Sequence, residues 1–206
     1  MQRHLLLLLI LSIIAAGCLT RKPPAIRYYV LEYPGKEALS GFDAATIKGS
    51  CLVRPVEVSP AYSTNQIAIR ENTHEIRYFA FNMWAVRPEP GLTGIMFRFL
   101  DDHRIFENLR SPGLIDETDY TLETMVYNLE VETDRRDYRA RLNMVFRLID
   151  NKQNRTVKEH MVNRSMPVEE RDLNLFAAAV STIFVEELAA FTEAAGEKLH
   201  QSGKIP

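Results

Sequence analysis

Residues 138–149 alternate between apolar and polar side chains, and this alternation constrains the fold more than any other feature of the chain. The apolar positions are Tyr138, Ala140, Leu142, Met144, Phe146 and Leu148, and arginines and Asn143 fill most positions between them. A strand with one apolar and one polar face is typical of an antiparallel sheet that buries one side only. The pattern therefore predicts a β-strand whose apolar face must be covered by another layer.

Further strands are expected on both sides of this one. Residues 120–133 alternate as well, and their predicted buried face joins Met125, Tyr127, Leu129 and Val131. β-Branched and aromatic residues indicate additional strands, at residues 27–33, 46–58 with a break at Pro55, 66–71 and 75–79 as a hairpin, and 156–165. Polar turns separate the strands that follow residue 120.

Two amphipathic helices are expected to cover the sheet. The first begins near Pro88 to Pro90 and ends between Asp102 and Phe106, because apolar residues recur there at helical spacing. The second is the longest element, about residues 168–199. Its apolar face is formed by Leu173, Phe176, Ala177, Val180, Phe184, Leu188, Phe191 and Ala195. The predicted fold is α+β: a mostly antiparallel β-sheet packed with two amphipathic helices, the longer one C-terminal.

The N-terminus carries a separate pattern that ends in a cysteine. A run of mainly apolar residues, 5–16, follows Arg3 and leads to Gly17 and Cys18. The run is shorter than the roughly 20 residues that span a bilayer and has the dimensions of a signal peptide. Its end resembles a bacterial lipobox, although Ala15 stands where leucine is usual. The sequence thus predicts cleavage between Gly17 and Cys18 and acylation of Cys18; an ordinary secretory signal and an uncleaved anchor are the alternatives.

Cleavage at this position divides the chain into three parts. Residues 1–17 are the predicted signal peptide, 18–26 a lipidated tether, and 27–206 a single α+β domain. No segment after the tether is expected to be long and apolar enough to span a membrane. Leu19 follows the cysteine in place of the aspartate that retains lipoproteins in a Gram-negative inner membrane. The predicted location is therefore the outer membrane, with the domain facing the periplasm.

The composition offers little support for catalysis. A formal net charge of −2 gives no electrostatic reason to expect a nucleic-acid partner. The five histidines are scattered, and no set of residues has zinc-ligand spacing. There is neither a Gly-rich phosphate loop nor a nucleophile elbow. We therefore expect no catalytic residue, no metal and no cofactor, and we interpret Cys51, in an apolar stretch, as a buried and unreactive thiol.

Short motifs follow the lipobox in a distinctive order. They are Tyr28-Tyr29-Val30-Leu31, Val53-Arg54-Pro55-Val56-Glu57-Val58, Tyr62, Gln66-Ile67-Ala68-Ile69-Arg70, Arg77-Tyr78 and Trp84. In this order and spacing the chain resembles the ABC-type transport auxiliary lipoproteins, the family of the paraquat-inducible protein C. The resemblance extends over nearly the whole chain after Cys18.

The resemblance implies a role and no reaction. Family members resemble accessory subunits of mammalian-cell-entry (MCE) lipid transport systems, in which an ABC permease works with channel-forming MCE-domain proteins. The expected protein is a non-catalytic periplasmic subunit that docks this channel at the outer membrane and supports membrane integrity. Its expected partners are the MCE-domain protein, the permease complex, the membrane that holds the acyl (palmitate) chains of Cys18, and other copies of itself in a homo-oligomer.

Two other functions remain open from the sequence. One is an accessory lipoprotein of another envelope machine, such as lipopolysaccharide insertion, and the other is a membrane-tethered enzyme. Three residues of the motifs are candidates for a partner-contacting or groove-lining surface: Tyr62, Arg70 and Trp84. For Trp84, the only tryptophan, packing at a corner between strand and helix is the alternative.

Overall fold

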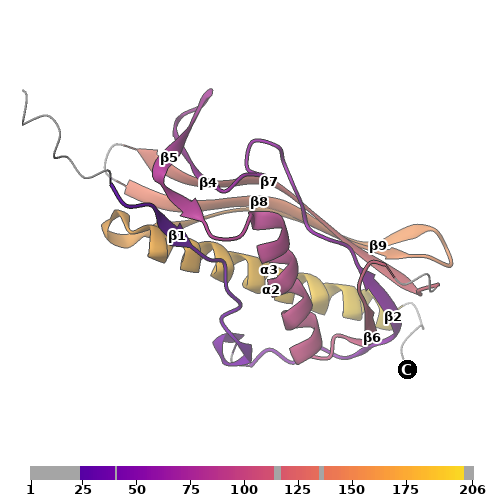
Figure 1. The fold of residues 1–206 in the computed structure, drawn as a ribbon. Helices are drawn as coiled ribbons and strands as arrows, with labels where there is room; N and C mark the ends of the chain where they lie inside the picture. Colours follow the sequence, from indigo (N-terminus) through magenta and orange to yellow (C-terminus); the bar gives the residue numbers. More distant parts are fainter. Residues whose placement is uncertain (1–23, 40, 114–116, 135–136, 202–206) are drawn as a thin grey trace, which may run out of the picture.

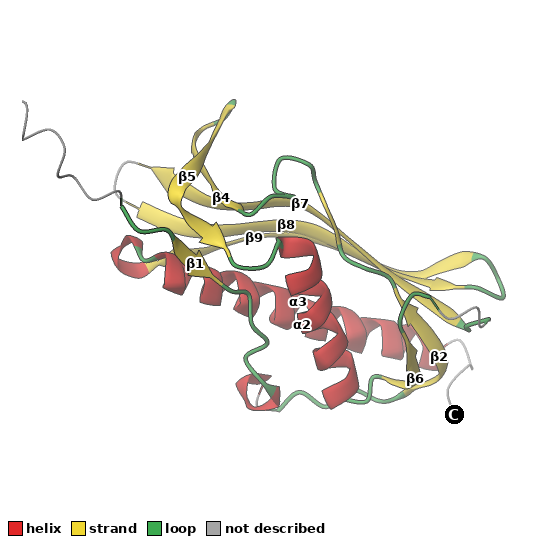
Figure 2. Ribbon diagram, viewed as in Figure 1, coloured by secondary structure: helices red, strands yellow, loops and turns green. Residues whose placement is uncertain are grey.

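A mixed β-sheet forms one layer of the protein, and helices α2 and α3 cover one of its faces (Figures 1 and 2). The computed structural model describes residues 24–39, 41–113, 117–134 and 137–201, so Gly17 and Cys18 lie outside the described residues. The strands are β1 (Arg27–Tyr29), β2 (Ile47–Val53), β3 (Glu57–Val58), β4 (Gln66–Asn72), β5 (Glu75–Trp84), β6 (Phe106–Arg110), β7 (Tyr120–Asp134), β8 (Asp137–Asp150) and β9 (Arg155–Val168). The helices are α2 (Pro88–Asp102) and α3 (Leu173–Gln201), with short 3-10 turns η1 (Lys36–Leu39) and η2 (Glu169–Arg171).

The long strands β7, β8 and β9 form an antiparallel meander, as their alternation predicts. Val126 of β7 pairs with Met144 of β8, and Met144 pairs in turn with Val162 of β9. The alternate residues of β8 that were expected to be buried, among them Leu142 and Phe146, are fully buried, except Tyr138 at the start of the strand, which is partly buried. One-sided burial of this meander is therefore confirmed.

The rest of the sheet corrects the prediction of a mostly antiparallel arrangement. Strands β2, β3 and β4 lie one after another along the same edge of β7, and all three run parallel to it. β1 is also parallel to β5, and β6 to β2. The α+β class is confirmed, but the sheet is mixed. Alternation indicates that one face is buried and contains no information on the direction of the neighbouring strand.

A bulge in β7 corrects one predicted face. The pairing of β7 with β8 shifts between Val126 and Asn128, which inserts an extra residue into the strand. Val126 faces the core before the bulge and Leu129 faces it afterwards. The prediction that Met125 and Tyr127 share one buried face with Leu129 is therefore wrong, and Tyr127 is 43% exposed. A shift by one residue moves every following side chain to the other side of a strand.

Helix α3 fills the core beneath the meander. Its predicted apolar face is buried, and the Phe191 ring stacks on Phe146 of β8 with 5.4 Å between the ring centroids. The helix begins later than the expected start at residue 168, because Glu170 and Arg171 have positive φ angles. The Asp172 carboxylate then caps it by accepting a hydrogen bond from the amide of residue 174 at 2.7 Å.

The composition of α3 corrects the expectation that no segment after the tether is long and apolar enough to span a membrane. One window of this helix, with a mean hydropathy of 1.6, is long and apolar enough to cross a membrane. However, 67% of that window is buried inside the protein. A helix that is apolar around most of its circumference is required where it is enclosed by a sheet and a second helix. The segment is thus accounted for as a core helix.

Helix α2 begins at Pro88 and ends at Asp102, as predicted. It crosses in front of α3 and contacts it (Figure 1).

The strand that follows α2, β6, was not predicted. A tight turn with Arg104 at positive φ leads directly into β6, where Phe106 pairs with Ile47 of β2. Only Phe106 is fully buried in this strand, so its sequence lacks the alternation of the longer strands.

A polar clamp fixes β2 to the start of β7. Asp119 accepts hydrogen bonds from the amide and the hydroxyl of Ser50 at 2.8 and 3.0 Å, and Lys152 Nζ lies 2.6 Å from its other oxygen. Gly49 beside it has a φ of +105°, and a Cβ there would lie 2.7 Å from the Asp119 carboxylate, so this position requires glycine. The bond from Lys152, followed by that from the Ser50 amide, lowers the pKa of Asp119 to about 2.

Replacing Asp119 with asparagine is expected to destabilise the fold by about 1 kcal/mol at neutral pH, because charge-assisted bonds to a partly exposed carboxylate are lost. The ordinary pKa is 3.8 and the folded-state value is about 2. The ionised Asp119 therefore stabilises the fold above about pH 4, and this contribution disappears as the pH falls towards 2. Urea unfolding of both proteins at stepped pH should show their difference shrinking on acidification. A difference independent of pH would contradict the clamp.

Cys51 is confirmed as a buried thiol within β2. Burial raises its pKa above the ordinary value for cysteine, which removes the reactive thiolate. We expect the folded protein to resist an aromatic disulfide reagent such as dithionitrobenzoate and to react fully once it is unfolded in guanidinium. Rapid labelling of Cys51 under native conditions would instead indicate that β2 opens locally.

Candidate functional site

A buried polar network joins β4, β7 and the segment between β3 and β4. It consists of Tyr62, Arg70, Asn128 and Glu130, and is called here the Arg70 network. The Glu130 side chain is 0% exposed, and both of its oxygens lie 2.9 Å from Nε of Arg70. The Tyr62 hydroxyl donates to Glu130 at 2.6 Å and accepts hydrogen bonds from Arg70 and Asn128 at 2.9 and 2.8 Å. The buried carboxylate thus has a cation and a hydroxyl as partners.

The sheet topology explains why these residues meet. β4 runs parallel to β7, and Arg70 pairs in register with Glu132, two residues after Glu130 on the same strand. The bulge before Glu130 leaves Leu129 and Val131 facing the core, so Glu130 points to the opposite side, where Tyr62 covers it. A buried charge is tolerated only when it is paired and hydrogen-bonded. The Arg70 network therefore ties the segment around Tyr62 to the centre of the sheet.

The electrostatics of the network indicate a structural role. Burial, followed by the hydrogen bond to Glu130, raises the pKa of Tyr62 above that of a free tyrosine. The hydrogen bond to Glu130 likewise raises the pKa of Arg70. Both groups stay protonated at neutral pH, whereas a general acid or base works best with a pKa near the working pH. The chemistry of this site is charge pairing rather than proton transfer.

A shallow polar groove of about 830 Å³ lies beside the Arg70 network. Its lining includes Arg70, Glu71, Asn128, Glu132, Arg139 and Arg141. Arg141 forms an ion pair with Glu132 at 2.9 Å, and Arg139 donates to the Ser165 hydroxyl at 2.8 Å. Side chains of both charge signs line the groove, so its electrostatic potential is not dominated by one sign. Few apolar side chains line it.

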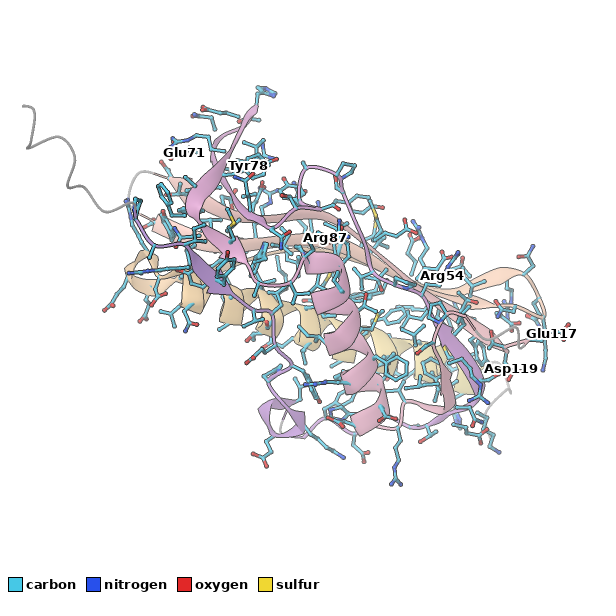
Figure 3. All side chains as sticks on the ribbon, in the orientation of Figure 1. Arg54, Glu71, Tyr78, Arg87, Glu117 and Asp119 are labelled. Carbon is cyan, nitrogen blue, oxygen red and sulfur yellow. The ribbon has the colours of Figure 1, made fainter. Side chains whose placement is uncertain are left out.

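The groove and the Asp119 clamp lie towards opposite ends of the molecule. Figure 3 shows Glu71 and Tyr78 at the end where β4 and β5 project, and Glu117 and Asp119 at the other end. Tyr78 of β5 binds the segment between β3 and β4 near the Arg70 network. Its hydroxyl donates a hydrogen bond to the carbonyl of Ala61 at 2.9 Å. The polar groove and the Asp119 clamp are therefore separate features of the surface.

The structure separates the three predicted surface candidates. Arg70 and Tyr62 lie together, with Arg70 at the rim of the groove and Tyr62 beneath it. Trp84 is elsewhere, at the end of β5, and is 1% exposed. Its ring packs on Phe176 of α3 with 5.8 Å between centroids. Its assignment to a partner or groove surface is wrong, since β5 ends against α3; the alternative of packing at a strand-to-helix corner is confirmed.

Sequence reasoning missed Glu130 and Asn128. Glu130 interrupts the apolar residues Leu129 and Val131, and an acidic residue at such a position signals a buried partner. Asn128 sits at the bulge, where the alternation of β7 changes phase. Over the described part of the chain, no three histidine, cysteine, aspartate or glutamate side chains converge in a way that could hold a metal ion.

Comparison with known proteins identifies the family. A family model described as the ABC-type transport auxiliary lipoprotein component matches residues 29–191. No curated protein sequence matches the chain significantly. Protein XCC0632 from Xanthomonas campestris is similar in structure, with 15% identity and a TM-score of 0.68 over 88% of this chain and 97% of that one. A second crystal structure, of an uncharacterized protein, has 12% identity and a TM-score of 0.64 over 83% of this chain and 99% of that one.

The two solved structures share the fold with this chain, and at these identities they carry no further information. The family match is broader evidence, because residues 29–191 run from the end of β1 through most of α3 and include the Arg70 network. The chain therefore belongs to the family of ABC-type transport auxiliary lipoprotein components.

Proposed function

We propose that the protein is a non-catalytic, lipid-anchored subunit of an MCE-type phospholipid transport system driven by an ABC permease. The observation that carries this proposal is the match of residues 29–191 to an ABC-type transport auxiliary lipoprotein component. An auxiliary component acts by contacting a transporter, so it requires an anchor, a rigid body and a contact surface. The order of the sequence motifs supports the more specific MCE assignment.

The proposed anchor is Cys18, exposed as the first residue after removal of residues 1–17. Residues 18–26 would form the tether and residues 27–206 the single domain. A fully extended chain spans about 3.3–3.6 Å per residue, so residues 19–25 reach at most about 25 Å. The domain would therefore stay close to its membrane. Leu19 after the cysteine supports the inner leaflet of the outer membrane, with the domain in the periplasm.

The groove beside Arg70 is the proposed contact surface for the MCE channel. Its lining includes Arg139 and Asp137 among side chains of both signs, which suits the polar rim of a protein–protein interface better than an acyl chain. The ion pair between Arg70 and Glu130 beneath it would keep this surface rigid. A rigid surface loses less conformational entropy on binding.

Crosslinking in native membranes, followed by affinity purification and mass spectrometry, tests this function. Recovery of an MCE-domain protein together with its permease supports the proposal. Recovery of an outer-membrane assembly factor alone would favour the lipopolysaccharide-insertion alternative. Recovery of no specific partner would overturn the accessory role.

A charge-reversal pair tests the proposed contact surface in the same experiment. Arg139→Glu, in the groove, should reduce the amount of crosslinked MCE-domain protein. Arg54→Glu is the matched control, because its side chain is 55% exposed and it lies outside the groove. Equal recovery with both variants would place the contact on another surface.

A further inference from the structure

An exposed apolar patch lies along the first strand of the domain. It consists of Ile26, Tyr28, Val30 and Phe81, called here the β1 patch, and each of these side chains is 45–62% exposed. Large apolar side chains normally appear singly on the surface of a soluble domain. Four of them gathered on β5, on β1 and on the residues directly before and after β1 indicate a contact with something outside the chain.

The pairing of β1 with β5 brings these side chains together. Arg27 pairs with Asn82 and Tyr28 with Met83, and extending this parallel register by one residue puts Ile26 beside Phe81. Tyr29, the alternate residue, points the other way and donates its hydroxyl to Asn82 at 3.0 Å. Because alternate residues of a strand share a face, Ile26, Tyr28 and Val30 lie on the side of the sheet away from α3.

The β1 patch follows the predicted lipid attachment site almost immediately. Residues 19–25 separate Cys18 from Ile26, and they include two consecutive prolines. At most about 29 Å of extended chain, eight steps of about 3.6 Å, therefore separates Ile26 from Cys18. Such a short tether makes any contact with the membrane effectively intramolecular, so a small apolar surface is sufficient.

The charges near the β1 patch favour a membrane over a protein partner. Arg21 and Lys22 precede the prolines in the tether, and the first acidic residue after Cys18 is Glu32. Basic side chains are attracted to anionic headgroups. Tyrosine and aliphatic side chains partition into the interfacial region of a bilayer.

We propose that the β1 patch rests in the headgroup region of the membrane that holds the acyl chains of Cys18. The domain then lies against this membrane along β1. The proposal depends on the lipid anchor of the proposed function.

A fluorescent label at the β1 patch tests this contact. Tyr28→Cys is labelled with an environment-sensitive fluorophore in the full-length, acylated protein, in which Cys51 is buried and does not react. The protein is reconstituted into vesicles of phosphatidylethanolamine and phosphatidylglycerol with brominated acyl chains. Lys198→Cys is the matched control, because it is exposed near the far end of α3 (Figure 1). Circular dichroism establishes that both variants are folded.

The brominated lipids are expected to quench the label at position 28 at least about two-fold more than the label at position 198. Flotation of the vesicles reports the anchor separately. Protein that floats with an unquenched label at position 28 overturns the membrane contact and leaves the anchor intact. Unlabelled Tyr28→Cys protein in the same vesicles, exposed to a mild oxidant, would form disulfide-linked dimers through position 28 if the patch instead contacts a second copy of the chain. If the protein does not float with the vesicles, the lipid anchor is absent, and the proposed membrane contact is overturned together with it.

Discussion

Replacing Arg70 with methionine is expected to lower the free energy of unfolding by about 3 kcal/mol, because it leaves a buried carboxylate without its cation. Glu130 is 0% exposed, and its carboxylate forms an ion pair with the Arg70 guanidinium at 2.9 Å. Methionine retains an unbranched apolar stem, so the loss reports the missing charge more than a cavity. Urea unfolding at neutral pH, followed by circular dichroism, measures the change.

Two further variants make this measurement specific. Arg54→Met removes an arginine whose side chain is 55% exposed and whose partner is Glu123, and it should cost less than about 1 kcal/mol. Combining Arg70→Met with Glu130→Met should recover much of the loss, because an apolar pair needs no solvation. If Arg70→Met costs no more than Arg54→Met, the Arg70 network does not hold the sheet together.

The elements that could be predicted from sequence are those whose burial is one-sided and local. β8 alternates along its whole length because α3 covers one face of it and solvent meets the other. The apolar face of α3 was predictable for the same reason, since the sheet fixes which residues must be apolar. Pro88 marks the start of α2, because proline is compatible with a first helical turn.

The features that could not be predicted depend on partners far away in the sequence. The parallel direction of β2, β3 and β4 is set by their order along β7, and no local pattern encodes it. The bulge before Asn128 gives β7 two competing apolar phases, so one predicted face was wrong. β6 is short and buries only one residue completely, which leaves no periodic signal.

The candidate site shows the same division. Tyr62 and Arg70 belong to the motifs that support the family resemblance, but the motifs do not reveal that both bind Glu130. That contact depends on the register between β4 and β7. Trp84 resembles a surface anchor by residue type alone, and its burial against Phe176 follows from where β5 meets α3.

Replacing Cys18 with serine is expected to abolish the proposed acylation and to remove the protein from its proposed place in the outer membrane, because a hydroxyl cannot replace the thiol in the predicted lipobox. The fold should be unchanged, since β1 begins only at Arg27. Metabolic labelling with a fatty acid and separation of the membranes measure both effects. Cys51→Ser is the matched control, because a buried thiol in β2 has no part in anchoring and this variant should remain acylated.

Serine at position 18 would also block cleavage, so residues 1–17 would persist and could hold the precursor in the inner membrane. A second version, in which an ordinary cleavable secretion signal replaces residues 1–18, removes this complication and should yield soluble protein. One acyl chain binds a membrane only weakly and stable anchoring needs more than one, so the apolar side chains of the β1 patch alone should not retain the domain. If this version stays on the membrane and the additional substitution Tyr28→Asp releases it, the residual membrane binding belongs to the β1 patch. If the protein stays on the membrane with and without Tyr28→Asp, Cys18 is not the anchor.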